Sequence, residues 1–106
     1  MKYFTKIIFS ALFGLLLFST TATAGNVGIG QKIYGTKLKD TCGFTGVKFT
    51  ASHTQKEWQA IYDSGKMGEE VKALCPKVEV YNEKWNDHLF SFAYEYGKGS
   101  GNEPSC

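Results

Sequence analysis

The first 24 residues have the pattern of an export signal, and this limits the folded protein to a short chain. Lys2 and Lys6 give a positive start, residues 7–18 are apolar, and small residues stand at the two positions that a signal peptidase reads. The apolar run is too short to span a bilayer comfortably. We therefore expect cleavage after residue 24. Residues 25–106 should then form one domain in the periplasm or outside the cell, with no membrane attachment.

The size and charge of the mature chain further limit which kinds of protein it could be. A domain this small buries only about 60–65% of its unfolded surface, so a disulfide or a cofactor would stabilise it noticeably. The chain has twelve lysines, no arginine and ten carboxylates, and two of the lysines lie in the signal, so the net charge of the mature protein is near zero. Without a basic cluster or arginines for phosphate contacts, the sequence indicates no nucleic-acid partner.

Three cysteines lie after the signal: Cys42, Cys75 and Cys106. In an oxidising compartment two of them can form a disulfide, and the odd number leaves one over. A Cys75–Cys106 bond would fix the polar, glycine-rich tail of residues 98–104. A Cys42–Cys75 bond would instead join the first and third predicted helices. The sequence leaves both pairings open.

The first predicted helix ends at a cysteine. Residues 25–30 are small and glycine-rich and predict an irregular lead, whereas the next eleven residues carry inward-facing side chains at helical spacing: Ile33, Tyr34, Leu38 and Thr41. Gly43 suits the position just after a helix C-terminus, which places Cys42 in the last turn.

The remaining pattern predicts three more helices and little or no sheet. Residues 44–52 predict a loop. Thr54 and Glu57 form a capping box that starts the second helix, with Trp58, Ile61 and Tyr62 on its buried side.

A third helix carries Met67, Val71, Leu74 and Cys75 on its apolar side and stops at Pro76. The last helix runs from Trp85 to Tyr96, and its apolar residues also include Leu89, Phe90, Phe92, Ala93 and Tyr94. We therefore expect a small all-α bundle of about four helices with an extended C-terminal tail.

In its order of elements the chain resembles a class I c-type cytochrome domain. The resemblance covers most of the mature chain, and its matching pieces are Gly30-Gln31-Lys32-Ile33-Tyr34 through Cys42, His53-Thr54-Gln55-Lys56-Glu57-Trp58 with Gly65, and the closing helix from Trp85 to Tyr96. The chain looks most like short exported proteins of this kind whose tails read Ser-Gly-Asn-x-Pro-Ser-Cys, as residues 100–106 do. The resemblance implies a cytochrome-c-like fold and a role in electron transfer.

The chain departs from this family at the haem attachment motif, Cys-x-x-Cys-His. Aligned on Cys42, the motif requires a cysteine at 45 and a histidine at 46, where this chain has Thr45 and Gly46. The methionine that usually precedes the last helix of the family is absent too, since Met67 comes too early. Only Cys42 can be carried over, as a single cofactor-binding position. We expect no covalently bound haem.

Other chemistries have few residues to support them. His53, His88 and Met67 could ligate iron in a non-covalent haem, but each histidine is better explained as a surface or cap-adjacent residue. The cysteines and histidines are too scattered for a zinc site. Cys42 lies at a helix C-terminus, where the helix dipole does not favour a thiolate. These observations predict no metal site and no enzyme activity.

The sequence therefore predicts a periplasmic or secreted, non-catalytic cytochrome-c-like protein that binds a protein partner, such as a periplasmic redox protein, as an accessory in electron transfer. One alternative is a haem-binding electron carrier with atypical attachment. Another is a small disulfide-bonded binding module or inhibitor with no redox history.

Overall fold

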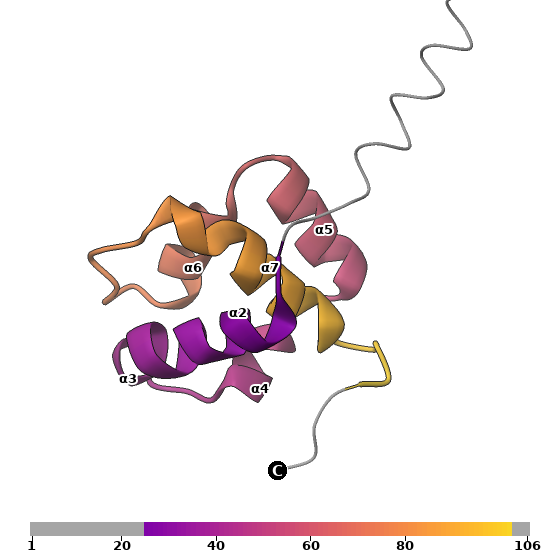
Figure 1. Cartoon of the computed structure of the whole chain (residues 1–106), viewed down its shortest axis with the longest axis horizontal. Coiled ribbons are helices and arrows are strands. Elements are labelled where there is room, and N and C mark those ends of the chain that lie inside the picture. The colour runs from indigo at the N-terminus through magenta and orange to yellow at the C-terminus, as the bar shows by residue number, and fades with distance from the viewer. Residues whose placement is uncertain (1–24, 103–106) are drawn as a thin grey trace, which may run out of the picture.

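A computed structural model describes residues 25–102, and within this range the chain is helical apart from its turns and loops (Figure 1). The elements in chain order are α2 (Val27–Ile33), the π-helical turn η1 (Tyr34–Leu38), α3 (Lys39–Cys42), α4 (Gly46–Thr50), α5 (Gln55–Asp63), α6 (Met67–Leu74), the 3₁₀ turn η2 (Glu83–Trp85) and α7 (Asn86–Glu95). No strand forms in the described range, where a single isolated β-bridge joins Thr54 to Lys98. The predicted all-α class is confirmed. The predicted signal and Cys106 lie outside the described residues.

The first helical run begins earlier than the sequence predicted. Asn26 caps α2 by accepting a hydrogen bond from the Ile29 N–H at 2.9 Å, so the glycine-rich lead is helical from Val27 onward. The earlier start of this helix depends on its packing against α7. Gly30 is buried there, and an alanine at this position would clash with the carbonyl of His88. Within residues 25–102, no helix of the fold is both long and apolar enough to cross a bilayer.

A π-helical turn interrupts the run between α2 and α3. The backbone N–H of Lys39 donates to the carbonyl of Tyr34, five residues earlier, which widens the turn. Tyr34 and Leu38 are buried as predicted, but Thr41 is exposed, so its predicted inward position was wrong. We attribute the difference to the wider turn, which rotates the residues after it and leaves Cys42 half-buried.

Residues 44–52 contain a helix where the sequence predicted a loop. Thr45 caps α4, and its hydroxyl accepts from the Lys48 N–H at 3.3 Å. Phe49 is fully buried and anchors this short helix in the core. Five residues form a stable helix here because tertiary packing, rather than propensity, holds them.

The two central helices match their predictions. The Thr54 hydroxyl accepts from the Glu57 N–H at 3.1 Å, and the Glu57 carboxylate accepts from the Thr54 N–H at 2.9 Å, so the capping box that starts α5 is complete. Gly65, with a φ of 75°, follows α5. Cys75 caps the end of α6, directly before Pro76.

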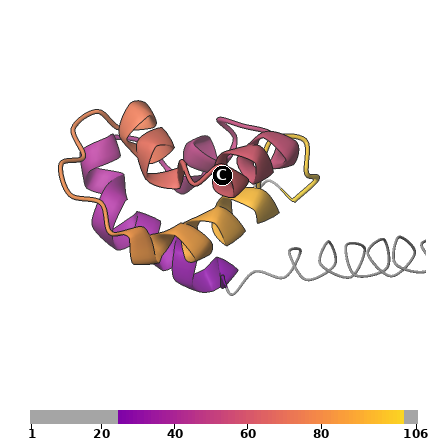
Figure 2. The same ribbon diagram turned by 90° about the horizontal axis from the view of Figure 1, so that it is seen from above.

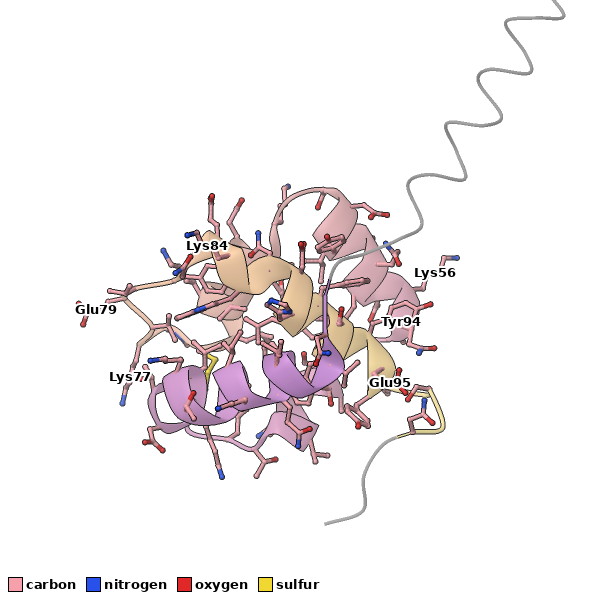
Figure 3. All side chains as sticks on the ribbon, in the orientation of Figure 1. Lys56, Lys77, Glu79, Lys84, Tyr94 and Glu95 are labelled. Carbon is pink, nitrogen blue, oxygen red and sulfur yellow. A yellow bond between two sulfur atoms is a disulfide. The ribbon has the colours of Figure 1, made fainter. Side chains whose placement is uncertain are left out.

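Helix α7 is the centre of the arrangement. Figures 1 and 2 both show α2 lying beside α7, with α5 and α6 on its other side. The α7 residues Leu89, Phe90, Phe92 and Ala93 are buried, as predicted. Tyr94, which the sequence placed with them, is 38% exposed and points outward in Figure 3.

Candidate functional site

The chain turns directly after Cys42, where the sequence predicted the end of the first helix. Gly43 adopts a left-handed conformation with a φ of 84°, and its N–H donates to the carbonyl of Lys39 at 2.9 Å. This closes α3 as a glycine at this position is expected to do. The turn leaves the Cys42 side chain half-buried, facing the end of α6.

Cys42 is bonded to Cys75, and the disulfide appears as the yellow bond in Figure 3. Of the two pairings that the sequence left open, the structure contains the one that joins the first and third predicted helices. The pairing of Cys75 with Cys106 is therefore wrong for this structure, because the Cys75 sulfur is already used. Cys106 itself lies outside the described residues.

The residues at this loop do not fit covalently attached haem. The sulfur of Cys42 is held by Cys75, so it has no thiol to add to a haem vinyl group. Thr45, at the position of the second cysteine, caps α4. Gly46, at the position of the ligating histidine, packs so closely that a Cβ there would lie 3.0 Å from Cζ of Phe92.

The remaining candidate iron ligands already have partners in the protein. The Nε2 of His53 lies 2.6 Å from a carboxylate oxygen of Glu70. The Nδ1 of His88 accepts a hydrogen bond from the Asn26 N–H at 3.1 Å. Met67 is buried in the core with 1% of its surface exposed. Among residues 25–102, no group of three or more His, Cys, Asp or Glu side chains is placed to hold a metal ion.

Aromatic side chains fill the interior beside the loop. The rings of Tyr34 and Phe49 stack with centroids 4.7 Å apart, and Phe49 lies 5.3 Å from the ring of Trp58. Trp58 is fully buried, and its indole N–H donates to the carbonyl of Thr50 at 2.9 Å. Tyr34, Phe49 and Trp58 therefore form a packed part of the core beside the loop.

A pocket of about 330 Å³ opens on the other side of the same loop. Its apolar walls come from three elements: Tyr34 from η1, Val47 from α4, and Phe92 and Tyr96 from α7 and its C-terminal cap. Gly46 contributes only backbone to the wall, next to the rings of Phe92 and Tyr34.

The rim of this pocket is polar and carries one charged group. Lys39 is the only charged residue in the lining, and it forms no ion pair with any described residue. Gln31 lies on the rim from α2, and its side-chain amide makes no hydrogen bond within residues 25–102. The backbone of Gly35 completes the rim beside open space, since a Cβ there would meet nothing within 4 Å.

The Tyr34 side chain links the pocket to residues 43–45, the loop between α3 and α4 that follows Cys42 and is called the cysteine loop below. Its hydroxyl donates to the carbonyl of Phe44 at 2.8 Å, which fixes the loop between α3 and α4. Burial raises the pKa of Tyr34 to about 12. The phenol therefore stays protonated and hydrogen-bonded, and the pocket wall that it forms is uncharged.

Comparisons with protein-family models, with curated proteins and with solved structures found no match to this chain.

The structure thus places Cys42 and Cys75 together and surrounds the cysteine loop with residues that the sequence had not assigned to a site. Tyr34 and Phe92 were predicted as core residues, and they also form the floor of the pocket. The sequence pattern did not assign Lys39 to a site. The one available signal was the pair of glycines at 35 and 46, which remove side chains from two sides of the same space.

Proposed function

We propose that this protein is an exported, non-catalytic binding protein with a cytochrome-c-like domain that carries no covalent haem and serves as an accessory in electron transfer. The proposal rests on the residue pattern described above and on the all-α fold, in which the first helix packs on the last. The export pattern gives it a periplasmic or secreted location.

The Cys42–Cys75 disulfide is the observation that carries the haem-free part of the proposal. In the family that the chain resembles, the sulfur at this position forms a thioether with haem. In this fold the same sulfur links α3 to the end of α6. A disulfide here would stabilise the fold as an attached cofactor would. It links the loop to a distant helix and lowers the conformational entropy of the unfolded chain.

The chemistry of the described side chains supports a binding role over a catalytic one. Both described cysteines are in the disulfide, so neither offers a nucleophilic thiolate. The two imidazoles contact Glu70 and the Asn26 backbone, so that His53 is linked to α6 and His88 links α7 to the start of α2.

The partner that this role implies is a periplasmic redox protein with an acidic docking surface. Exposed lysines occur along the first helical run and in α4, with one exposed carboxylate, Asp40, among them: Lys32, Lys37, Lys39 and Lys48. None of them forms an ion pair within residues 25–102. Unpaired surface charges of one sign steer oppositely charged partners and make association depend on ionic strength.

Visible absorbance of the mature chain tests the proposal. The protein is expressed in a host with haem maturation, beside an ordinary c-type cytochrome as a positive control. We expect no Soret band. A Soret band that survives acid–acetone extraction would overturn the proposal, and a band that is extracted would support the non-covalent electron carrier instead.

Two matched variants make this test specific to the predicted position. Cys42→Ala removes the only sulfur that could form a thioether at the family position, whereas Cys106→Ala changes a cysteine in the tail. A covalent band lost in the first variant and kept in the second would show attachment at Cys42. Thiol titration of the wild type should find one free thiol without reductant and three with it.

The small binding module with no redox history remains as a second candidate, because the disulfide and the pocket would serve it equally well. Affinity capture with purified redox proteins separates the two candidates. Salt-sensitive binding to an acidic redox protein favours the accessory role. A small-molecule ligand without such binding favours the module.

A further inference from the structure

We propose that the pocket formed by Tyr34, Val47, Phe92 and Tyr96 binds a small aromatic monocarboxylate. The inference deepens the proposed function, since it rests on the protein being a binding protein, but it concerns a pocket that haem chemistry does not involve. Its evidence is the shape, the wall chemistry and the charge of this one pocket, which lies beside the cysteine loop.

The volume of the pocket and its aromatic walls suit a ligand with a single planar ring. A volume of about 330 Å³ is at the lower end of the range of about 300–1,000 Å³ that is typical of ligand pockets. Three aromatic side chains line it, and aromatic rings favour stacked or edge-on contacts with another ring. Phe92 already contacts Tyr34 and Tyr96 at centroid distances of 6.3 and 5.7 Å, so the rings form a continuous floor.

The donors at the rim of the pocket favour a ligand that carries a negatively charged group on its ring. Lys39 is the only charged lining residue, its ammonium has no carboxylate partner in the described chain, and no carboxylate lines the pocket. The Gln31 amide adds a second unused donor on the same rim. A carboxylate accepts from both kinds of donor, and charge-assisted hydrogen bonds are roughly twice as strong as neutral ones.

Two backbone features keep the pocket open. Gly46 supplies wall without a side chain, and the π-helical turn between Tyr34 and Leu38 forms the opposite edge. Such turns are rare, and they occur frequently at functional sites. The glycines at 46 and 35 therefore add backbone to a lining whose rings come from Tyr34, Phe92 and Tyr96.

An amide-resolved NMR titration of the mature, oxidised protein with benzoate tests the inference. We expect saturable shifts at Gly35, Lys39, Gly46 and Tyr96, with a Kd on the order of 1 mM or below for so small a ligand. Benzamide, which has the same ring without the charge, should bind about tenfold more weakly. Equal affinity for the two compounds, or shifts that map elsewhere, would overturn the proposal.

Variants then separate a specific site from general attraction to lysines. Lys39→Gln should weaken benzoate binding about tenfold. Lys37→Gln removes an equal charge from the same helical run but lines a different hollow, and it should change nothing. Equal losses in the two variants would contradict a defined site.

A pocket-blocking variant covers the case in which a charge change alters the fold. Gly35→Leu adds a side chain at the rim, where a Cβ meets no atom within 4 Å, so folding should be retained while the opening is covered. Retained benzoate affinity in this variant would refute the site. The outcome is independent of the haem test, because a haem-bearing protein could still bind benzoate and a haem-free protein could fail to bind it.

Discussion

The Cys42–Cys75 disulfide should account for a large share of the stability of this domain. It closes a loop with a sequence separation of 33 residues, for which the chain-entropy model gives about 3.7 kcal/mol. Cys75 is also buried, with 1% exposure, so replacing its sulfur should cost about 1 kcal/mol of apolar burial in addition. A domain of this size has a total stability of only about 5–10 kcal/mol.

The perturbation is Cys42→Ala together with Cys75→Ala, made in a Cys106→Ala background so that the tail thiol cannot form a new bond. We expect the free energy of unfolding to fall by about 4–5 kcal/mol. Urea unfolding followed by tryptophan fluorescence measures it, since Trp58 is fully buried in the folded state. The loss would leave a total stability of only about 0–6 kcal/mol.

The Cys106→Ala background is itself the control for the pairing. If Cys42 and Cys75 are bonded, this change should alter the free energy of unfolding by less than about 0.5 kcal/mol, as for an ordinary surface substitution. A loss of several kcal/mol from Cys106→Ala alone would refute the reasoning. It would show that Cys75 pairs with the tail in solution.

Three further predictions test the packing, the capping box and the ionisation of the core. Gly30→Ala should destabilise the fold by at least about 1–3 kcal/mol, because its Cβ would lie 2.0 Å from the carbonyl oxygen of His88. Gly35→Ala is the matched control and should stabilise by about 0.5–1 kcal/mol; similar urea midpoints for both would refute the close approach of α2 and α7. Thr54→Ala should lower the free energy of unfolding by about 0.5–2 kcal/mol through loss of the cap, and no change in the urea midpoint would contradict the capping geometry. Because Tyr34 has a folded pKa of about 12, the free energy of unfolding should fall as pH rises from about 10 to about 12, by up to about 3 kcal/mol. Stability falls with pH because the folded state favours the protonated phenol. The contribution of Tyr34 to the free energy of unfolding is therefore fully present below the unfolded pKa and is lost as pH rises toward the folded pKa. When the urea midpoint is plotted against pH, the wild type should fall more steeply over this range than Tyr34→Phe. Parallel curves would contradict a raised pKa for Tyr34.

The features that the sequence predicted correctly depend on neighbouring residues. The capping box needs only Thr54 and Glu57, three residues apart, and Gly43 ends its helix through a bond to Lys39. Such local signals act before any tertiary contact forms, so the pattern alone identifies them. The end of α3 and the start of α5 follow from them.

The features that the sequence missed depend on contacts between distant segments. Helix α4 is too short to be stable alone, and it forms because Phe49 packs between Tyr34 and Trp58. The choice of Cys42 as the partner of Cys75 requires α3 and α6 to meet. The pocket combines residues from the first helical run, α4 and α7, and no local pattern marks such a convergence.

The disulfide and a thioether at Cys42 exclude each other, because one sulfur atom cannot form both bonds. The two other positions of the attachment motif have structural roles in this fold that follow from the same arrangement. Thr45 caps α4, and Gly46 leaves room for the rings of Phe92 and Tyr34. Placing the cysteine and histidine of a Cys-x-x-Cys-His motif at these positions would remove the Thr45 cap and put a Cβ 3.0 Å from Phe92, while the Cys42 sulfur would still be bonded. The absence of the motif and the presence of the disulfide, the short helix and the pocket are therefore one linked arrangement. Attaching haem at Cys42 would therefore require breaking the disulfide and changing both Thr45 and Gly46.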